Sequence, residues 1–355
     1  MNKENILVIN PGSTSTKIAI FNNEKLIFEK IINHPDNELA NFRQISEQND
    51  YRYNLIINHL YKENFNFHNL RAIVARGGLI KPIASGVYAI NQNMVNDLNN
   101  ALYGQHASNL GALIANKIAE KYQVPAFIAD PVVVDELWPV ARISGLKNVK
   151  RKSLFHALNQ KSVARKISAQ INKKYEEANF VVAHLGGGIS VSAHYQGQVV
   201  DTNNALNGDG PFSPERSGTL PLAEFAKICC ENQYDYTIVN QIISSQGGIF
   251  SYFGTRDLKL LEEKALEDQE VMMILEAMCY QVSKEIGAYA TALKGQLDGI
   301  IITGGLAKSN FLINLIKKYI SWISLIYVVP GENELVALNR AALNALNEQT
   351  EIKQY

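Results

Sequence analysis

Residues 6–21 read ILVINPGSTSTKIAIF and decide the fold. The apolar run Ile6–Asn10 breaks at a Pro-Gly pair, passes through four hydroxyl side chains and resumes as Lys17–Phe21. This pattern predicts a strand, a tight hydroxyl-rich turn and a second strand. After another turn, Lys25–Ile32 is expected to return as a third strand. The chain therefore opens with a three-stranded meander.

The same pattern returns halfway along the chain. Phe180–Leu185 is an apolar run, three glycines form a turn, Ile189–His194 resumes and Gln198–Asp201 continues. Aligning Asn10 with His184 gives an offset of 174 residues, close to half of the 355-residue chain. A repeat of this length indicates two related domains that each open with a meander. The chain length also favours two domains.

Strand-like and helix-like segments alternate after each meander. Apolar runs or amphipathic spacing mark residues 72–75, 110–121, 125–129, 310–319, 326–329 and 335–346. Mixed sheets covered by helices are therefore expected. Another apolar run, Gly299–Thr303, ends in Gly304 and Gly305 directly before a helix-like segment. A glycine turn between a strand and a helix suits a nucleotide.

Composition excludes several classes of partner. Lys and Arg total 34 and Asp and Glu total 34, so no broad charge excess favours nucleic acid or an anionic membrane. Apolar runs such as Ile323–Val329 fall short of the roughly 20 residues that cross a bilayer. The polar start shows no signal-peptide pattern, so a soluble cytoplasmic protein is expected. The cysteines form neither a disulfide framework nor a metal motif, and we interpret all three as helical packing residues: Cys229, Cys230 and Cys279.

Three glycine-bearing turns could hold an anion. In Asn10–Lys17, small residues expose backbone N–H groups, hydroxyls such as Ser13 and Ser15 add donors, and Lys17 adds a charge for phosphate. A single turn of this kind is more often a plain hairpin. The second turn reads HLGGG, and its glycines let backbone approach a phosphate because no Cβ intervenes: Gly186, Gly187 and Gly188. Together with the turn at 304–305, these turns predict a phosphate site at strand ends.

In order and approximate spacing, three segments resemble the phosphate and adenosine motifs of the acetate and sugar kinase, heat-shock chaperone and actin superfamily. They are NPGSTSTK (10–17), HLGGG (184–188) and ITGGLAKS (302–309). Within that superfamily, the chain resembles the acetokinase family. The resemblance lies in VINPGSTSTKIAIF (8–21), ARGG (75–78), PFSPERSGTLP (211–221) and YVVPGENE (327–334).

The resemblance implies an α/β fold of two related ribonuclease H-like domains. Each domain is expected to hold a mixed five-stranded sheet flanked by helices, with ATP in the cleft between them. The expected domains are residues 1–152, against which the C-terminal helix 333–355 packs back, and residues 153–332. ATP/ADP and Mg²⁺ are the implied cofactors, and a homodimer or a higher homo-oligomer is the implied assembly.

The implied reaction transfers a phosphoryl group from ATP to a short-chain carboxylate, with butyrate expected first. A carboxylate is already deprotonated at neutral pH, so the obstacle is repulsion between two anions rather than the lack of a base. Arginine suits this task because its forked donors bind carboxylate or phosphate oxygens in pairs. Arg76 at a strand end and Arg216 in a turn-rich loop match arginines of the family pattern. A structural role is the alternative for each.

Three histidines are candidates for contact with anions. His156 follows Ser153, a plausible helix cap, in the first turn of an amphipathic helix. It resembles the family histidine at the transferring phosphoryl group, and a polar cap is its alternative role. His106 resembles a second active-site histidine. His184 could support the second phosphate turn through a hydrogen bond.

Oxygen ligands for magnesium form a further set. Asp130 ends the run Ala126–Ala129, so its carboxylate should project from the carboxyl end of a strand, where it suits Mg²⁺. Asn10 and one glutamate complete the set that the resemblance implies. Glu332 is favoured over Glu334, and the placement of a gap decides between them.

Two positions bear on the detail of the nucleotide site. Gly187 stands where acetate kinases usually have an asparagine, so bare backbone replaces one side-chain donor to phosphate. Arg256 falls near a family arginine that packs on the adenine ring, and an exposed helix-start residue is its alternative role.

Other functions stay open at this point. Acetate, propionate and isobutyrate are alternative acceptors, because one methylene changes binding by only about 1–3 kcal/mol. Chaperones and filament proteins of the superfamily bind ATP without this chemistry, but no segment resembles their added modules. A regulator with a degenerate nucleotide site is disfavoured because the candidate residues are all present, including Asn10, Lys17, Asp130, His156 and both arginines.

Overall fold

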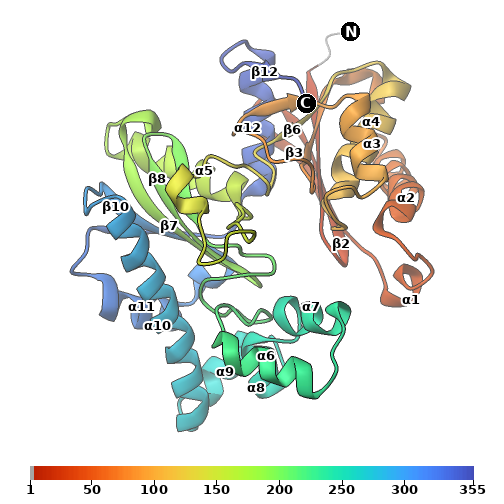
Figure 1. Cartoon of the computed structure of the whole chain (residues 1–355). Helices are drawn as coiled ribbons and strands as arrows, with labels where there is room; N and C mark the ends of the chain where they lie inside the picture. The colour runs from red at the N-terminus through yellow and green to blue at the C-terminus, as the bar shows by residue number, and fades with distance from the viewer. Residues whose placement is uncertain (1–3) are drawn as a thin grey trace. The chain divides into compact units, whose positions relative to one another are not determined.

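The computed structural model describes residues 4–355, which divide into two compact units (Figure 1). The first unit runs to Val134 and includes the C-terminal segment Asn333–Tyr355. The second unit is Asp135–Glu332.

The boundary between the units differs from the expected one. The expected first domain continues to residue 152, whereas residues 135–152 belong to the second unit. Arg151 accounts for this placement, because its guanidinium donates to Asp201 (2.7 Å) and to the carbonyl of Thr202 (2.9 Å). The Trp138 N–H also donates to a carbonyl of the second sheet, at 2.9 Å.

The first unit contains a mixed sheet of seven strands in the order β12-β5-β6-β4-β1-β2-β3. The strands are β1 (Asn5–Pro11), β2 (Ser15–Asn22), β3 (Lys25–Asn33), β4 (Leu70–Arg76), β5 (Val87–Ala89), β6 (Ala126–Ala129) and β12 (Ile352–Lys353). The predicted count of five strands was wrong for this sheet. The three-residue β5 and the two-residue β12 extend it beyond β6.

The second unit contains a mixed sheet of five strands in the order β11-β10-β7-β8-β9. The strands are β7 (Asn179–Leu185), β8 (Ile189–Tyr195), β9 (Gln198–Thr202), β10 (Gly299–Gly304) and β11 (Ile326–Pro330). β7 is antiparallel to β8 and parallel to β10. The predicted five-stranded mixed sheet is confirmed here.

The two sheets share a strand order when β5 and β12 are set aside. β1 and β7 are the central strands, each of seven residues, and their first residues Asn5 and Asn179 lie 174 residues apart. Asn10 pairs with Lys17 across the first hairpin, and His184 pairs with Ser190 across the second. This common order agrees with a duplicated meander, as the sequence repeat indicates.

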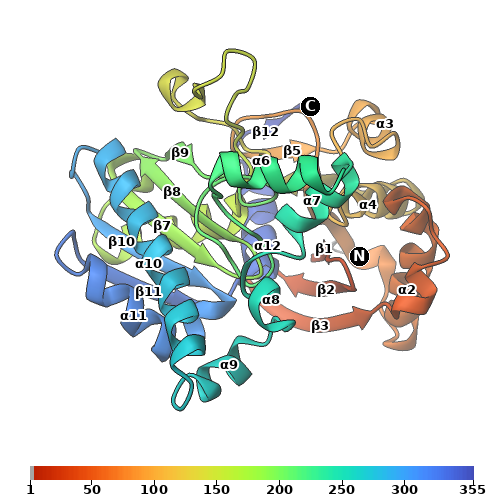
Figure 2. The ribbon, with the colours of Figure 1, turned by 60° about the horizontal axis from the view of Figure 1, so that its bottom comes forward.

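Helices cover both sheets. Those of the first unit are α1 (Asp36–Leu39), α2 (Asn49–Lys62), α3 (Gln92–Asn99), α4 (Asn109–Tyr122) and α12 (Glu334–Leu346). Those of the second are α5 (Ala157–Gln170), α6 (Leu222–Glu231), α7 (Tyr236–Ser244), α8 (Gly248–Phe253), α9 (Leu258–Lys264), α10 (Gln269–Ala292) and α11 (Asn310–Ile320). Both α4 and α12 pack on β1, β4 and β6. In the second unit α10 lies along β7 and β8 (Figure 2).

Side chains of β7 alternate between two cores. Val181 and Ala183 belong to the cluster that α10 and α11 complete, whereas Phe180 and Val182 belong to the cluster that Val163 and its neighbours on α5 complete. A strand sends successive side chains to opposite faces, so a strand covered on both faces becomes a continuous apolar run. This double burial explains why β7 is recognisable from the sequence.

The segment from α6 to α7 differs from the rest of the second unit because neither helix has a buried residue. Cys230 on α6 is exposed and Cys229 is half-buried, so the interpretation of these two cysteines as packing residues was wrong. Cys279 on α10 is buried and does pack in the core. An apolar residue type alone did not distinguish a lightly packed helix from a core helix.

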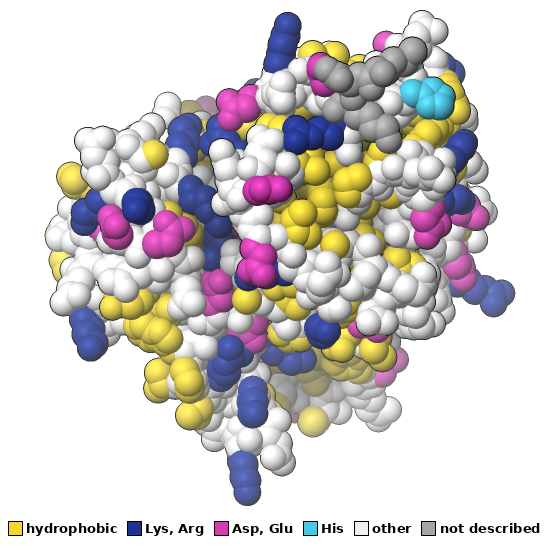
Figure 3. Space-filling model, turned by 90° about the horizontal axis from the view of Figure 1, so that it is seen from above, with side chains coloured by type: hydrophobic (Ala, Val, Ile, Leu, Met, Phe, Trp, Pro, Cys, Tyr) yellow, Lys and Arg dark blue, Asp and Glu magenta, His cyan; other side chains and the backbone are white. Residues whose placement is uncertain are grey.

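The surface carries charges of both signs. On the face drawn in Figure 3, Lys and Arg side chains are interspersed with Asp and Glu over the described residues. This mixture agrees with the equal totals of 34 basic and 34 acidic residues. Among residues 4–355, no helix combines the length and apolar character needed to cross a membrane.

His34 makes the stability of the first unit dependent on pH. Burial, and next the charge of Arg52, lowers the pKa of His34 from 6.5 to about 4. Between pH 6.5 and 4 the His34 ring binds a proton in the unfolded chain but stays unprotonated in the folded unit. The free energy of unfolding should therefore fall by about 1.4 kcal/mol per pH unit between pH 6.5 and 4. Urea unfolding across this range measures the slope.

The matched variants are His34→Gln and His68→Gln. His34 is 3% exposed, whereas His68 lies on the surface. Replacing His34 should remove this contribution to the slope, and replacing His68 should leave it. Equal slopes in wild type and His34→Gln would contradict the assignment.

Candidate active site

The first hydroxyl-rich turn joins β1 to β2. The Gly12 N–H donates to the Ser15 carbonyl at 2.7 Å, which closes the turn. Ser13 is exposed and Ser15 is half-buried at the tip. Asn10 and Lys17 pair across the strands, so their side chains lie on the same face of the sheet. The turn thus brings four of the predicted phosphate-site residues together.

Arg52 of α2 holds this turn from behind, and the sequence analysis missed it. Its guanidinium donates to the carbonyls of Gly12 (2.7 Å) and Ser13 (2.9 Å) and to Gln48 Oε1 (2.8 Å). The side chain is fully buried. In a trans peptide the N–H points opposite to the carbonyl, so the next N–H groups point away from Arg52. Arg52 therefore helps to turn backbone donors toward a ligand.

A carboxylate links two predicted site residues at the start of α12. Glu334 Oε2 accepts from Asn10 Nδ2 at 2.6 Å and lies 3.3 Å from Arg76 Nη1. Glu334 is 6% exposed. Glu332 belongs instead to the second unit, where its Oε1 lies 3.8 Å from His184 Nε2. The structure thus brings Glu334 to Asn10 within the first unit.

The ARGG segment is shaped by α4. A Cβ on Gly78 would lie 2.5 Å from Asn109 Cα, and a Cβ on Gly111 would lie 2.4 Å from the Arg76 carbonyl oxygen. Asn109 also accepts from the Leu79 N–H at 2.8 Å. Only glycine allows this close packing. The contacts fix the backbone on which Arg76 is carried.

His106 lies just before α4. Its Nδ1 accepts from the Ser108 N–H at 3.2 Å and lies 2.8 Å from Ser108 Oγ. Because a backbone N–H can only donate, His106 Nδ1 carries no proton in this arrangement. The neutral ring then carries its proton on Nε2.

Asp130 follows β6 in the left-handed region, with φ of 38°. Its Oδ1 accepts from Ser85 Oγ at 2.6 Å and from the Gly86 N–H at 2.8 Å, and the residue is 6% exposed. These bonds hold the carboxylate in one orientation at the end of the strand. The predicted position of Asp130 beyond the end of a strand is therefore observed.

In the second unit a loop folds over the HLGGG turn. Ser213 Oγ donates to the Gly187 carbonyl at 2.6 Å. A Cβ on Gly188 would clash with the Arg216 guanidinium, so any larger residue there would displace that side chain. Arg216 and the glycine turn, which lie far apart in sequence, are thus brought into contact.

Two arginines converge on Glu215, which the sequence analysis did not single out. Arg216 Nη2 lies 3.6 Å from Glu215 Oε1, and Arg256 Nε lies 3.5 Å from Glu215 Oε2. Burial lowers the pKa of Arg216, while the charge of Glu215 opposes that shift. Arg216 Nε is buried without a hydrogen-bond partner among residues 4–355. Arg256 lies over the ring of Phe250, 4.1 Å from its centroid.

Two histidines stack beside the same turn. The rings of His156 and His184 are 3.7 Å apart and nearly parallel, at 8°. His156 is the N-cap residue of α5, without a side-chain capping bond, so the helix begins three residues later than the predicted Ser153 cap would place it. His184 Nδ1 lies 2.8 Å from Asn159 Oδ1, and Asn159 Nδ2 donates to the Glu332 carbonyl at 2.8 Å.

The third glycine turn follows β10. Gly304 has φ of 93°, and a Cβ there would lie 2.3 Å from the Leu185 carbonyl oxygen. Gly305 begins a short 3-10 helix with open space around its Cα. Ser309 then caps α11 by accepting from the Leu312 N–H at 3.1 Å. The predicted order of strand, glycine turn and helix is therefore observed.

Several oxygen-bearing side chains of the first unit are candidate ligands for magnesium. Among residues 4–355, no group of three or more His, Cys, Asp or Glu side chains is placed to hold a metal by itself. Asp130, Glu334 and Asn10 supply hard oxygen atoms within the first unit. One or two carboxylates with the remaining ligands from water and substrate phosphate is the usual magnesium arrangement. The donor set fits an ion that arrives with a nucleotide.

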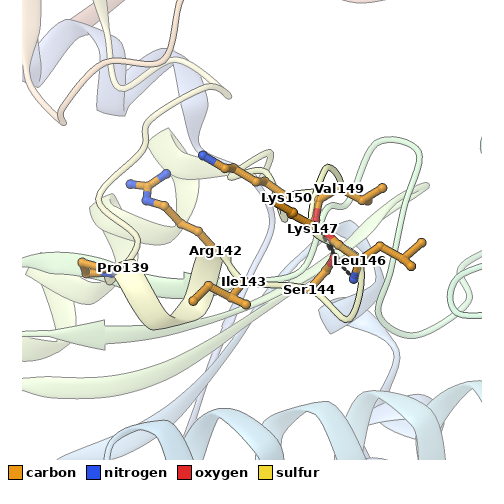
Figure 4. Close-up of a pocket in the computed structure, with 8 residues that line it drawn as sticks. All are labelled: Pro139, Arg142, Ile143, Ser144, Leu146, Lys147, Val149 and Lys150. Atoms are coloured by element: carbon orange, nitrogen blue, oxygen red, sulfur yellow. Dashed lines mark hydrogen bonds between the residues drawn. The ribbon is translucent and has the colours of Figure 1, made fainter.

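A separate surface pocket of about 260 Å³ lies in the second unit (Figure 4). None of the predicted site residues lines it. Its lining is Pro139, Arg142, Ile143, Ser144, Leu146, Lys147, Val149 and Lys150. Arg142 is paired with Asp135. The pocket is therefore formed by one local loop and does not belong to the candidate site.

Comparison with known proteins places the chain in a family. The model of the acetokinase family matches residues 136–325. Butyrate kinase 1 of Clostridium acetobutylicum is 48% identical over 351 residues, covering 99% of each chain. A probable butyrate kinase of Listeria monocytogenes serotype 4a is 47% identical over 351 residues, again covering 99% of each chain.

Solved structures share the fold at low sequence identity. A propionate kinase from Francisella tularensis superposes with a TM-score of 0.75 at 18% identity, covering 95% of this chain and 98% of that one. An acetate kinase from Porphyromonas gingivalis superposes with a TM-score of 0.76 at 16% identity, covering 96% and 99%. The sequence matches define a kinase that acts on a carboxyl group. The chain belongs to the acetokinase family.

Arg52 should affect both stability and nucleotide binding. Arg52→Met leaves the Gly12 and Ser13 carbonyls without their donors, and we expect the free energy of unfolding to fall by about 2–4 kcal/mol. Release of the turn should also weaken ATP binding about 10-fold or more. Urea unfolding and calorimetric titration with ATP measure the two effects. Arg43→Met, at an exposed arginine nearby, is the control. Loss of stability with unchanged ATP affinity would limit Arg52 to a structural role.

Proposed function

We propose that this protein reversibly transfers a phosphoryl group between ATP and butyrate, giving butanoyl phosphate and ADP. The observation that carries the proposal is 48% identity to butyrate kinase 1 of Clostridium acetobutylicum along 99% of both chains. A carboxylate oxygen attacks the γ-phosphorus, and the bond from that phosphorus to the bridging oxygen of ADP breaks. ADP leaves with the electron pair, so no proton transfer to a base is required.

The residues of the first unit suit the handling of anions. In this proposal the turn residues Ser13, Ser15 and Lys17 donate to phosphate, and Arg76 binds the substrate carboxylate. His106 donates through Nε2, consistent with its Nδ1 accepting from Ser108. Arginine and lysine thereby offset the repulsion between the carboxylate and the phosphate.

The residues of the second unit suit the transferring group and the nucleotide. Arg216 and His156 donate to the transferring phosphoryl group, because charge spreads over its oxygens in the transition state. The turn Gly186, Gly187 and Gly188 binds phosphate by its backbone, with His184 beside it. Gly304 and Gly305 accept the adenosine. Arg256 packs on the adenine or orients Glu215, which it pairs with at 3.5 Å.

We propose that Asp130, Asn10 and Glu334 hold Mg²⁺ that arrives with ATP. Bound magnesium supplies positive charge that offsets the charge of the phosphates. Glu334 takes the place of the favoured Glu332 in this proposal because Glu334 bonds directly to Asn10, at 2.6 Å. We also propose a cytoplasmic homodimer or larger homo-oligomer, and light scattering of the purified chain tests the assembly.

Substrate preference follows from the proposal. Purified protein with Mg-ATP should form acyl phosphate with a maximum at four carbons across the acids from formate to hexanoate. Hydroxylamine trapping measures the product, and isobutyrate tests tolerance of a branch. A maximum at acetate or propionate would transfer the assignment to those acids. No product from any acid would overturn the kinase proposal.

Glu334 and Glu332 provide a matched pair for the metal proposal. Glu334→Gln removes a buried charge while keeping the shape, so the Mg²⁺ concentration for half-maximal activity should rise roughly 10-fold or more. Glu332→Gln should change it less than about twofold, because that side chain is 39% exposed and water screens its charge. A titration of activity with Mg²⁺ measures both. The reverse order would restore Glu332.

A further inference from the structure

A buried chain of polar side chains runs behind His156. His156 Nδ1 lies 2.8 Å from Ser190 Oγ, and Gln160 Nε2 donates to the same oxygen at 2.8 Å. Gln160 Oε1 lies 3.0 Å from His194 Nε2, and His194 Nδ1 lies 2.8 Å from Tyr175 Oη. Ser190, Gln160 and His194 are 0% exposed and Tyr175 is 4% exposed. All five residues belong to the second unit.

The orientation of the Gln160 amide follows from a backbone contact. Its Nε2 lies 3.1 Å from the Ser190 carbonyl oxygen, which can only accept. The opposite amide orientation would place two acceptors against each other. Gln160 therefore presents its NH₂ group to Ser190 and its oxygen to His194.

The hydroxyl of Ser190 then has a single direction for its proton. Its oxygen faces two N–H donors, Gln160 Nε2 at 2.8 Å and the His156 backbone N–H at 3.4 Å. A serine hydroxyl has one proton and two lone pairs, so two donors occupy both lone pairs. The Ser190 hydroxyl therefore donates its one proton in a hydrogen bond to His156 Nδ1, and this nitrogen must be the acceptor.

We propose that Ser190 and Gln160 are positioning residues that hold His156 as the neutral tautomer with its proton on Nε2. In this state Nε2 is the ring nitrogen that donates, and in the proposed function its acceptor is an oxygen of the transferring phosphoryl group. The nitrogen that a histidine presents to a ligand is set by the bond that its other nitrogen makes. The inference deepens the proposed function and rests on the role of His156 in it.

His194 and Tyr175, at the other end of this hydrogen-bonded series, support the same donor and acceptor assignments. Burial, followed by the charges of Lys161 and Arg165, lowers the pKa of His194 well below its usual value, so this ring is neutral. His194 Nε2–H donates to the Gln160 oxygen, and Nδ1 accepts from the Tyr175 hydroxyl. Each donor therefore meets one acceptor, from Tyr175 through to His156.

The stack on His184 preserves this arrangement. The parallel rings, 3.7 Å apart at 8°, restrict rotation of the His156 ring about its Cβ–Cγ bond. His184 is itself held at Nδ1 by Asn159 Oδ1, at 2.8 Å. The ring of His156 thus keeps Nδ1 toward Ser190 and Nε2 on the other side.

Nitrogen NMR of the complete protein labelled with ¹⁵N-histidine tests the tautomer directly. The chain has seven histidines, and His156→Asn identifies the signals of His156 by their loss. At pH 7.5 we expect an unprotonated Nδ1 and a protonated Nε2. A protonated Nδ1, or a ring protonated on both nitrogens, would overturn the proposal. This NMR measurement does not depend on enzymatic activity.

Ser190→Ala and Ser192→Ala are a matched pair on β8. Both serines are 0% exposed, but Ser192 Oγ bonds to Thr202 Oγ1 (2.7 Å) and takes no part in the hydrogen bonds that lead to His156. Ser190→Ala should mix the tautomers of His156 and lower kcat about 10- to 100-fold, with the KM for ATP changed less than about threefold. Ser192→Ala should leave the tautomer and kcat close to wild type. Equal kcat in both variants would contradict the positioning role.

Gln160→Met provides an independent variant should Ser190→Ala fold poorly. The substitution frees one lone pair of Ser190, so the Ser190 oxygen can accept a hydrogen bond from His156 Nδ1–H. The tautomer with its proton on Nδ1 should then appear. A wild-type tautomer in Gln160→Met would argue against the role of Gln160. If no acid yields acyl phosphate, the proposed function fails while the tautomer measurement still decides the arrangement of the chain.

Discussion

Hydrogen bonding of turn carbonyls by buried side chains is the interaction on which the glycine-bearing turn of each unit depends. A turn that binds phosphate through its N–H groups must satisfy its carbonyl groups elsewhere. In the first unit Arg52 donates hydrogen bonds to the carbonyls of Gly12 and Ser13. In the second unit Ser213 does so for Gly187, at 2.6 Å. The glycines give the backbone its access, and these partners determine which way its donors point.

Charge in the site is local and paired. The chain has equal numbers of acidic and basic residues, 34 of each, so no net field offsets the repulsion between carboxylate and phosphate. Each unit instead holds one predicted arginine beside a glutamate: Arg76 with Glu334 at 3.3 Å, and Arg216 with Glu215 at 3.6 Å. A neighbouring carboxylate orients a guanidinium before the substrate binds.

Much of the fold could be predicted from the sequence because the central strands are buried on both faces, as Phe180–Leu185 shows. The glycine turns were visible for the same reason, since they interrupt such runs. Arg52 could not be predicted, because the turn carbonyls to which it donates lie 37 to 40 residues away and leave no local pattern. The choice between Glu332 and Glu334 likewise depends on a contact over 324 residues, with Asn10. Short added strands such as β12 were also invisible, since two residues carry no periodicity.

In the proposed function, the duplicated meander gives the two units different side chains for handling phosphate. Lys17 pairs with Asn10 in the first hairpin, and Ser190 pairs with His184 at the same place in the second. The first unit thus has a cation at this position, whereas the second has a hydroxyl that reaches back to His156, at 2.8 Å. A serine cannot supply charge, but it can fix the proton of a neighbouring imidazole. In the proposed function, divergence at one paired position therefore exchanges a direct cation for a histidine donor, and the cation of the second unit comes from the loop that carries Arg216.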